Sequence, residues 1–196
     1  MALVLDGTTG IVSANIADGT IGASDLASGA ITSTALPAGS VVQVVQFSTT
    51  ATGTVGNSAA QAPGPFQASI TPISATSKIL IKITAHFGTD TGDARFPGFW
   101  VKRNGVDVVV GNKGGNNGTN VSFAGQIAVG AYVTMSQASF VYLDSPNSSS
   151  ALTYALWWQA DYIGGARINY FNRPHDLTDA MRLWTPSTMV LMEIAG

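Results

Sequence analysis

Cysteine is absent from this chain of 196 residues, and charged residues make up only 10% of it. The lack of cysteine excludes a disulfide framework, a thiolate nucleophile and a cysteine-ligated zinc site. Soluble domains usually carry about 25% charged residues. The shortage does not indicate disorder, because 45% of the residues are hydrophobic. A surface with so little charge is typical of a protein that is covered by copies of itself or by other partners.

Positive charge is missing from the first part of the chain. No lysine or arginine precedes Lys78, whereas Asp6, Asp18 and Asp25 all lie before it. The net charge is −2 and there is no basic cluster, which argues against nucleic-acid binding through phosphates. No apolar run approaches the roughly 18–20 residues of a membrane span. Residues 1–5 are apolar but have no basic start, so we predict no signal peptide and no membrane insertion.

Aliphatic residues recur at every fifth position near the start of the chain. An α-helix turns each side chain by about 100°, so residues five apart form no stripe. In a flat strand, residues five apart face opposite sides. The spacing therefore requires a turn or bulge in every repeat, or several chains wrapped about a common axis. Ile11 extends the series back by one step, and its main members are Ile16, Ile21, Leu26, Ile31, Leu36 and Val41.

Glycines punctuate the same segment at ten-residue intervals, at Gly19, Gly29 and Gly39. Asp18 and Ser28 precede the first two, which is typical of turns with positive φ at the glycine. A single strand cannot bury this ladder of aliphatic side chains, so we expect the six residues to form the core of a trimeric stalk over residues 1–41. Three chains can place their aliphatic side chains on one axis.

Two other structures for this segment remain open at this point. A pentapeptide-repeat β-helix prefers a pattern that Ala14-Asn15-Ile16 and Ser24-Asp25-Leu26 match loosely. The segment would give fewer than two coils of such a helix. The other alternative is a flexible linker.

The remaining residues, 42–196, read as a separate β domain, the head. Alternating apolar residues are separated by turn clusters, and no segment has a convincing amphipathic helix. Asn104-Gly105 is a strong two-residue hairpin turn. This pattern predicts an all-β fold, with an antiparallel, jelly-roll-like β-sandwich following the stalk. The expected strands are 41–49, 66–73, 78–87, 98–103, 106–111, 120–127, 132–143, 152–162, 166–171 and 188–195.

The sequence resembles short-repeat fibre proteins of tailed bacteriophages, especially those of marine phages. The repeats Asn15-Ile-Ala-Asp-Gly-Thr-Ile and Asp25-Leu-Ala-Ser-Gly-Ala-Ile carry the resemblance at one end. The small β-sandwich heads of such fibres resemble this chain at Ser74-Ala-Thr-Ser-Lys-Ile-Leu-Ile, Leu143-Asp-Ser-Pro-Asn and Thr188-Met-Val-Leu-Met-Glu-Ile-Ala. The resemblance implies a trimeric virion component, anchored by its N-terminus to another virion protein, with the head presented to host or solvent. It supplies no set of functional residues.

Catalytic motifs are scarce, and we predict no enzyme, no cofactor and no bound metal. Glu193 is the only glutamate and falls in the last expected strand, where a structural role is expected. Asp90 and Asp93 lie in a loop that lacks the terminal glutamate of an EF-hand. His175 precedes Asp176, but no nucleophile motif accompanies the pair.

Aromatic residues are the better candidates for contact with a receptor or glycan. Most of them should be core, and alternation along 152–162 places Trp158 in the core and Trp157 on the polar face. Trp157 is then expected in a subunit interface or a glycan site. The loop 112–118 is polar and suited to hydrogen bonding with a ligand. The candidate contact residues are Trp157, Trp184, Asn116, Asn117 and His175.

Together these observations predict a homotrimeric phage fibre on the tail or capsid surface of a virion. Its N-terminus is expected to fasten it to the particle, and its head to contact a host glycan or protein. The alternative is a capsid-surface fibre or decoration protein with a purely structural role. A polysaccharide-degrading hydrolase is a third hypothesis, which incubation with host polysaccharide would test.

Overall fold

A computed structural model describes residues 17–28, 30–32, 35–56, 61–89, 96–114, 119–126, 135–160, 168–175 and 183–196. The chain divides into two compact units, Met1–Pro37 and Ala38–Gly196. Within the described residues, no helix is long and apolar enough to cross a membrane. Ile16, Asp90, Asp93, Asn116, Asn117 and Asp176 lie outside the described residues.

The described part of the N-terminal unit is built from turns that recur every five residues. In each turn the amide of the fourth residue donates to the carbonyl oxygen of the first, over 2.9–3.1 Å. One of these turns contains η2, a 3-10 helix over Ala23–Asp25. The donor and acceptor pairs are Thr20 to Ala17, Asp25 to Gly22, Ala30 to Ala27, and Ala35 to Thr32. One of the predicted alternatives, a turn in every repeat, is therefore confirmed for these four repeats.

The glycine positions agree with this arrangement. Gly19 has a φ of 76° and Gly39 a φ of 89°, a backbone region that costs little only for glycine. The aliphatic residues that follow the first three turns are not buried by their own chain, whereas Leu36 after the fourth turn is partly buried. Ile21, Leu26 and Ile31 are exposed by 43–58%, so the described repeats do not form a single-chain coil with an inward ladder.

The C-terminal unit is all-β, and the described residues contain no α-helix. Alternation of buried and exposed residues runs through its longer strands, as one buried face requires. The strands are β1 (Val41–Thr49), β2 (Gly53–Gly56), β3 (Ala62–Ile70), β4 (Lys78–Thr89), β5 (Gly98–Arg103), β6 (Val106–Asp107), β7 (Phe123–Ala124), β8 (Ser136–Asp144), β9 (Leu152–Gln159), β10 (Ile168–Phe171) and β11 (Ser187–Ile194).

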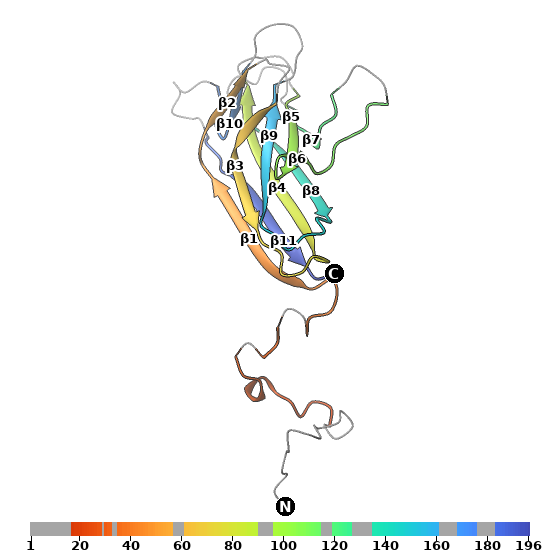
Figure 1. The fold of residues 1–196 in the computed structure, drawn as a ribbon. Coiled ribbons are helices and arrows are strands. Elements are labelled where there is room, and N and C mark those ends of the chain that lie inside the picture. Colours follow the sequence, from red (N-terminus) through yellow and green to blue (C-terminus); the bar gives the residue numbers. More distant parts are fainter. Residues whose placement is uncertain are drawn as a thin grey trace, which may run out of the picture. The chain divides into compact units, whose positions relative to one another are not determined.

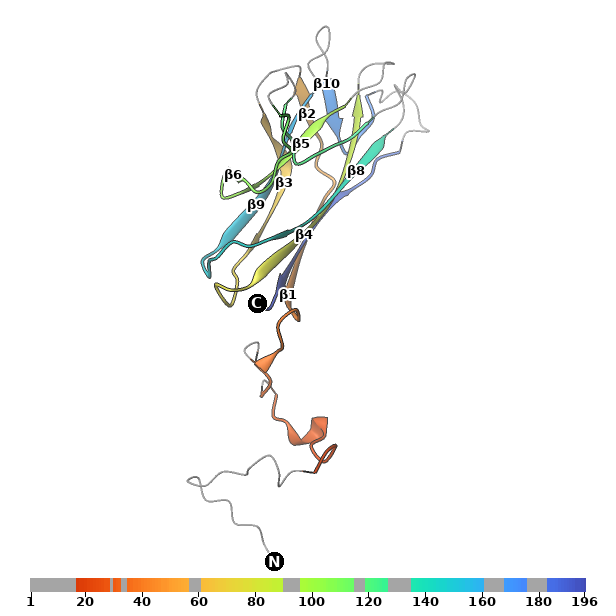
Figure 2. The ribbon, with the colours of Figure 1, turned by 90° about the vertical axis from the view of Figure 1, so that its right-hand side faces the viewer.

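These strands form two antiparallel sheets packed as a β-sandwich, as predicted (Figures 1 and 2). In one sheet β4 lies between β11 and β8, because both pair with the same stretch of β4. β1 pairs with the side of β11 that faces away from β4. β10 pairs with the last residues of β4, Phe87–Thr89, and β2 pairs with β10. The second sheet has the order β3-β9-β5-β6, with β7 also pairing with β5. We call them the β4 sheet and the β9 sheet.

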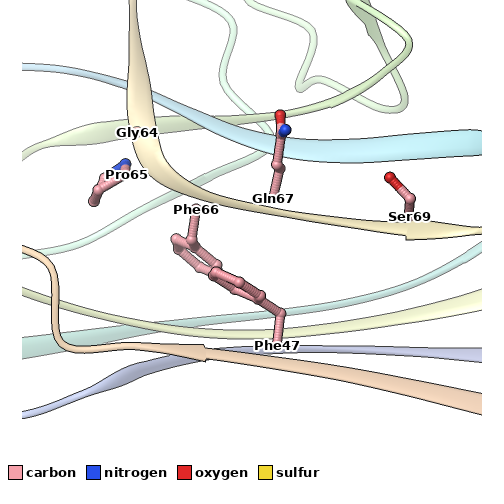
Figure 3. Close-up of a pocket in the computed structure, with 6 residues that line it drawn as sticks. All are labelled: Phe47, Gly64, Pro65, Phe66, Gln67 and Ser69. Atoms are coloured by element: carbon pink, nitrogen blue, oxygen red, sulfur yellow. The ribbon is translucent and has the colours of Figure 1, made fainter.

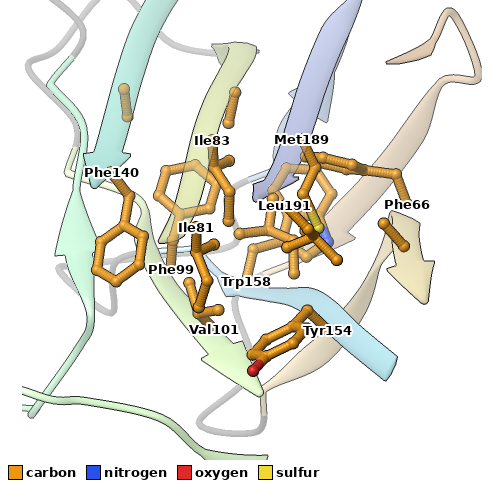
Figure 4. Close-up of a cluster of buried hydrophobic side chains, with 14 of the residues drawn as sticks. Phe66, Ile81, Ile83, Phe99, Val101, Phe140, Tyr154, Trp158, Met189 and Leu191 are labelled. Carbon is orange, nitrogen blue, oxygen red and sulfur yellow. The ribbon is translucent and has the colours of Figure 1, made fainter. Parts of the chain in front are cut away.

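The core lies between the two sheets and is rich in aromatic rings (Figure 4). Phe99 stacks on Phe123 with ring centroids 4.8 Å apart, and Trp158 meets Phe171 edge to face at 5.5 Å. Rings in such geometry add to the free energy of apolar burial. Trp158 is fully buried, which confirms its predicted place. The predicted inward face of β4 is also confirmed, with Ile79, Ile81, Ile83, Ala85 and Phe87 all buried.

Several strand bounds differ from the sequence prediction. β1 and β5 have the predicted bounds, and Asn104 and Gly105 have the positive φ angles of a tight hairpin. β2 was not predicted, because it is short and its partner β10 is remote in sequence. The predicted strands 106–111 and 120–127 shrink to two residues each. Beyond β6 the chain makes its last hydrogen bond to β5 at Val108, whose amide donates to the Val101 carbonyl oxygen. It returns to β5 at Ser122, whose hydroxyl accepts from the Val101 amide.

Candidate functional site

The outward face of the β9 sheet holds the strongest candidate for a contact site. Along β9 the buried residues alternate with half-buried ones, so Thr153, Ala155, Trp157 and Gln159 face away from the core. This confirms the predicted orientation of Trp157. Its neighbours across the sheet are Pro63 of β3 and Trp100 of β5.

Trp157 has a charged partner on the same face. The Lys102 ammonium lies 5.3 Å from the centroid of the Trp157 ring, within the range of a cation–π contact. The same ammonium donates to Asp107 over 2.6 Å. Lys102 pairs with Asp107 across the strands β5 and β6. An aromatic surface beside a fixed cation and carboxylate can stack on a sugar ring while hydrogen bonding to its hydroxyls.

Trp100 does not add to this surface, although it also faces outward. It is buried, and its ring lies near Gly98, over which the Val121 side chain packs. A Cβ atom at Gly98 would come within 2.8 Å of that valine. Tyr154 and Trp158 are fully buried and are likewise unavailable to a ligand. Trp157 is therefore the accessible tryptophan among the described residues of this face.

An open groove lies beside this face, between the edge strands β1 and β3 (Figure 3). It encloses about 490 Å³ and is lined in part by Phe47 and Phe66, whose rings stack with centroids 6.4 Å apart. Gln67 and Ser69 point from β3 away from these rings. Sequence reasoning did not find the groove, because it joins two strands that pair with different sheets.

His175 lies on the opposite side of the sandwich. It is exposed, and its ring centroid is 5.4 Å from that of Tyr170. The Arg173 guanidinium lies over the same tyrosine ring at 4.1 Å. Tyr170 faces outward from the β4 sheet, because its neighbour Phe171 is in the core. His175 and Trp157 therefore cannot contact the same small ligand.

Trp184 is more than half exposed and precedes β11 in the β4 sheet. Close by in sequence, the Pro186 carbonyl oxygen lies 2.8 Å from Nδ1 of His86. No contact in the described structure joins Trp184 to Trp157. The five candidate residues thus do not form one site, and Asn116 and Asn117 lie outside the described residues.

Two buried carboxylates have structural partners instead of catalytic ones. Asp144 accepts hydrogen bonds from Arg103 over 2.5 Å and from the Tyr154 hydroxyl over 2.6 Å. Burial, reinforced by the hydrogen bond to Asp144, raises the pKa of Tyr154 well above its usual value. Burial is the largest influence and by itself would lower the pKa of Arg103, but the hydrogen bond and charge attraction of Asp144, together with smaller contributions from Tyr154, raise it overall.

Glu193 is buried in β11 without a cation beside it in the described structure. It accepts from the Gln43 side chain over 2.5 Å and from the Ile73 amide over 2.8 Å. Burial by itself would raise the pKa of Glu193, but hydrogen bonds led by that from Ser77 lower it overall. The expected structural role of this residue therefore rests on hydrogen bonds, and no salt bridge is involved.

No cluster of three or more potential metal ligands occurs among the described residues.

Comparison with known proteins gives little information about function. No protein-family model and no curated protein matches the sequence. Among solved structures, a chain from the "Structure of infectious bursal disease virus Gx strain" is a weak match, with a TM-score of 0.36 and 14% identity. The match covers 80% of this chain but only 39% of that one, and it carries no argument about function.

Proposed function

We propose that the protein is a homotrimeric fibre of a bacteriophage virion, fastened by its N-terminal repeats and contacting the host surface through its head. The head is proposed to be jelly-roll-like, which the orders β1-β11-β4-β8 and β3-β9-β5-β6 support. The resemblance to short-repeat phage fibres supports the virion location. No catalytic activity is part of this proposal.

One observation supports the proposal of a trimeric stalk. Ile21, Leu26 and Ile31 each follow a turn, recur at a fixed spacing and are exposed in the single chain. Regularly spaced aliphatic side chains that one chain leaves in water gain free energy when other chains cover them, at about 25 cal/mol per Å². Light scattering on the full chain should then give three times the chain mass of 20.2 kDa.

Replacing these three residues by serine should abolish trimer formation, or raise the concentration that it requires by at least about a hundredfold. The matched control changes Ala17, Ala27 and Ala30, which lie in the same turns, to serine. Mass measurements over a dilution series check both variants. A wild-type protein that stays monomeric and folded at high concentration would overturn the proposed fibre.

Trp157 is the proposed host contact on the head. Changing Trp157 to alanine should reduce binding to glycan arrays or host cells by about tenfold or more, since a stacking ring is lost. Changing Trp184 to alanine serves as the comparison, because that residue precedes β11, a strand of the other sheet. Equal losses in both variants would argue against a site at Trp157. Imaging of intact particles locates the protein on the tail or on the capsid.

A further inference from the structure

The outward face of the β4 sheet carries an apolar row that crosses four strands. Strand register places one residue from each of β1, β11, β4 and β8 side by side. They face away from the core, because their neighbours in each strand point into it. We call these residues the apolar row: Val44, Met192, Leu80 and Leu143. A row of this kind on an open sheet face is unusual, since such faces normally carry polar residues.

On one side of the apolar row, the next two rows change from partly apolar to polar. The next row consists of Gln46, Val190, Lys82 and Val141, so it adds two valines. The row after that carries only hydroxyl groups: Ser48, Thr188, Thr84 and Ser139. An apolar patch with hydrogen-bonding groups along one side is compatible with a protein–protein interface, whose apolar core is bordered by polar residues.

The outward face of the β9 sheet differs in chemistry. Its described residues include Gln67, Ser69, Thr153, Lys102 and Asp107. The two faces of one sandwich therefore suit different partners. The polar face with Trp157 suits a hydrated ligand, whereas the face with the apolar row suits another protein surface.

We propose that this face of the β4 sheet packs against the same head domain in a second copy of this chain. The inference rests on the proposed oligomeric fibre and assigns the surface by which neighbouring heads meet. The outward charges on these four strands are Lys78 and Lys82, with no carboxylate among them. Copies therefore meet through the apolar row, with Lys82 in the row beside it.

The size of the face agrees with this occupant. The β4–β8 ladder is nine residues long, and four strands at about 4.8 Å spacing give a face of roughly 19 by 30 Å, or about 570 Å². In a trimer each copy turns this face to the threefold axis, so three copies bury about 1,700 Å² in total, or about 570 Å² per pair, which is less than the roughly 1,000 Å² of an interface that holds partners together alone. A trimer whose stalk already holds its chains together needs no larger contact between heads.

The edge strand β1 supports the same occupant. Among the described strands it pairs only with β11, and its sequence Val-Val-Gln-Val-Val-Gln-Phe-Ser-Thr contains neither charge nor proline. Edge strands that face solvent usually carry charged residues or prolines, which hinder pairing with another chain. β3, the edge of the other sheet, has Pro63 and Pro65. The unprotected edge adjoins the apolar row through Val44, so both are covered if copies pack here.

Single cysteines test the proposal cleanly, because the natural chain has none. Val141 on this face and Val106 in the β5–β6 hairpin are matched, with exposures of 63% and 68% in the single chain. Maleimide should label the V141C variant at least about tenfold more slowly than V106C in the assembled full chain. The two rates should converge in denaturant. V141K should weaken assembly, while V106K and V141T should leave it unchanged.

The outcomes separate this inference from the proposed function. If light scattering shows trimers while V141C and V106C react at equal rates, the assignment of this face is wrong and the trimer stands. If the protein is monomeric, the trimer and the face both fail. Slow labelling of V141C in trimers, with fast labelling of V106C, supports both.

Discussion

Changing Asp144 to alanine is expected to lower the free energy of unfolding by about 3–5 kcal/mol. The carboxylate is buried and accepts from both the Arg103 guanidinium and the Tyr154 hydroxyl. Its removal leaves a partly buried cation and a buried hydroxyl without their shared partner. Since small domains are stable by only about 5–15 kcal/mol, the urea midpoint should fall sharply. Tryptophan fluorescence reports the transition.

Asp107 provides the matched control for this prediction. It also pairs with a basic residue of β5, but the Asp107 side chain is 35% exposed, against 9% for Asp144. The D107A variant should lose only about 0–1 kcal/mol, because water can reach the site of the lost carboxylate and replace it at little cost. Measurements at one protein concentration keep any contribution from assembly constant. Equal losses for D144A and D107A would contradict the structural role given to the buried cluster.

Changing Glu193 to glutamine should cost about 2–3 kcal/mol at neutral pH, since a charged acceptor with several donors becomes a neutral amide. The amide nitrogen must also face donors such as the Ile73 amide and the Gln43 side chain. Urea unfolding measures the loss. The D107N variant, which changes an exposed carboxylate in the same way, should stay close to the wild type.

The same glutamate predicts how stability depends on pH. The folded state lowers the pKa of Glu193 below its usual value of 4.5. Its contribution to stability is therefore complete above that value and is lost as the pH falls through the folded pKa. Unfolding measured between neutral and acid pH should show this loss in the wild type but a shallower one in E193Q. Parallel curves for the two proteins would remove Glu193 as the cause.

Local features of this protein could be predicted from its sequence. The five-residue spacing predicted a turn in each repeat, because neither a helix nor a flat strand has that period. Gly19 and Gly39 predicted positive φ angles, and Asn104-Gly105 predicted the hairpin. Alternation along β9 also separated Trp158 from Trp157. In each case, residues close together in the chain determine the backbone geometry.

Features that join remote segments could not be predicted in this way. The sequence places Arg103, Asp144 and Tyr154 on three strands, and only the register of β5, β8 and β9 with their partners brings them together. Trp100 alternates outward, yet the folded chain covers it and leaves it only 2% exposed. The apolar row likewise depends on the alignment of four strands.

The sequence by itself therefore determined the repeating turns, the β character of the head and the direction of most side chains along each strand. The tertiary structure alone decided which strands lie side by side, which outward residues are covered and where apolar side chains gather into one surface. The physical reason is that dihedral preferences and alternation act over a few residues. Strand order and register instead depend on how well the two inward faces fill a shared core.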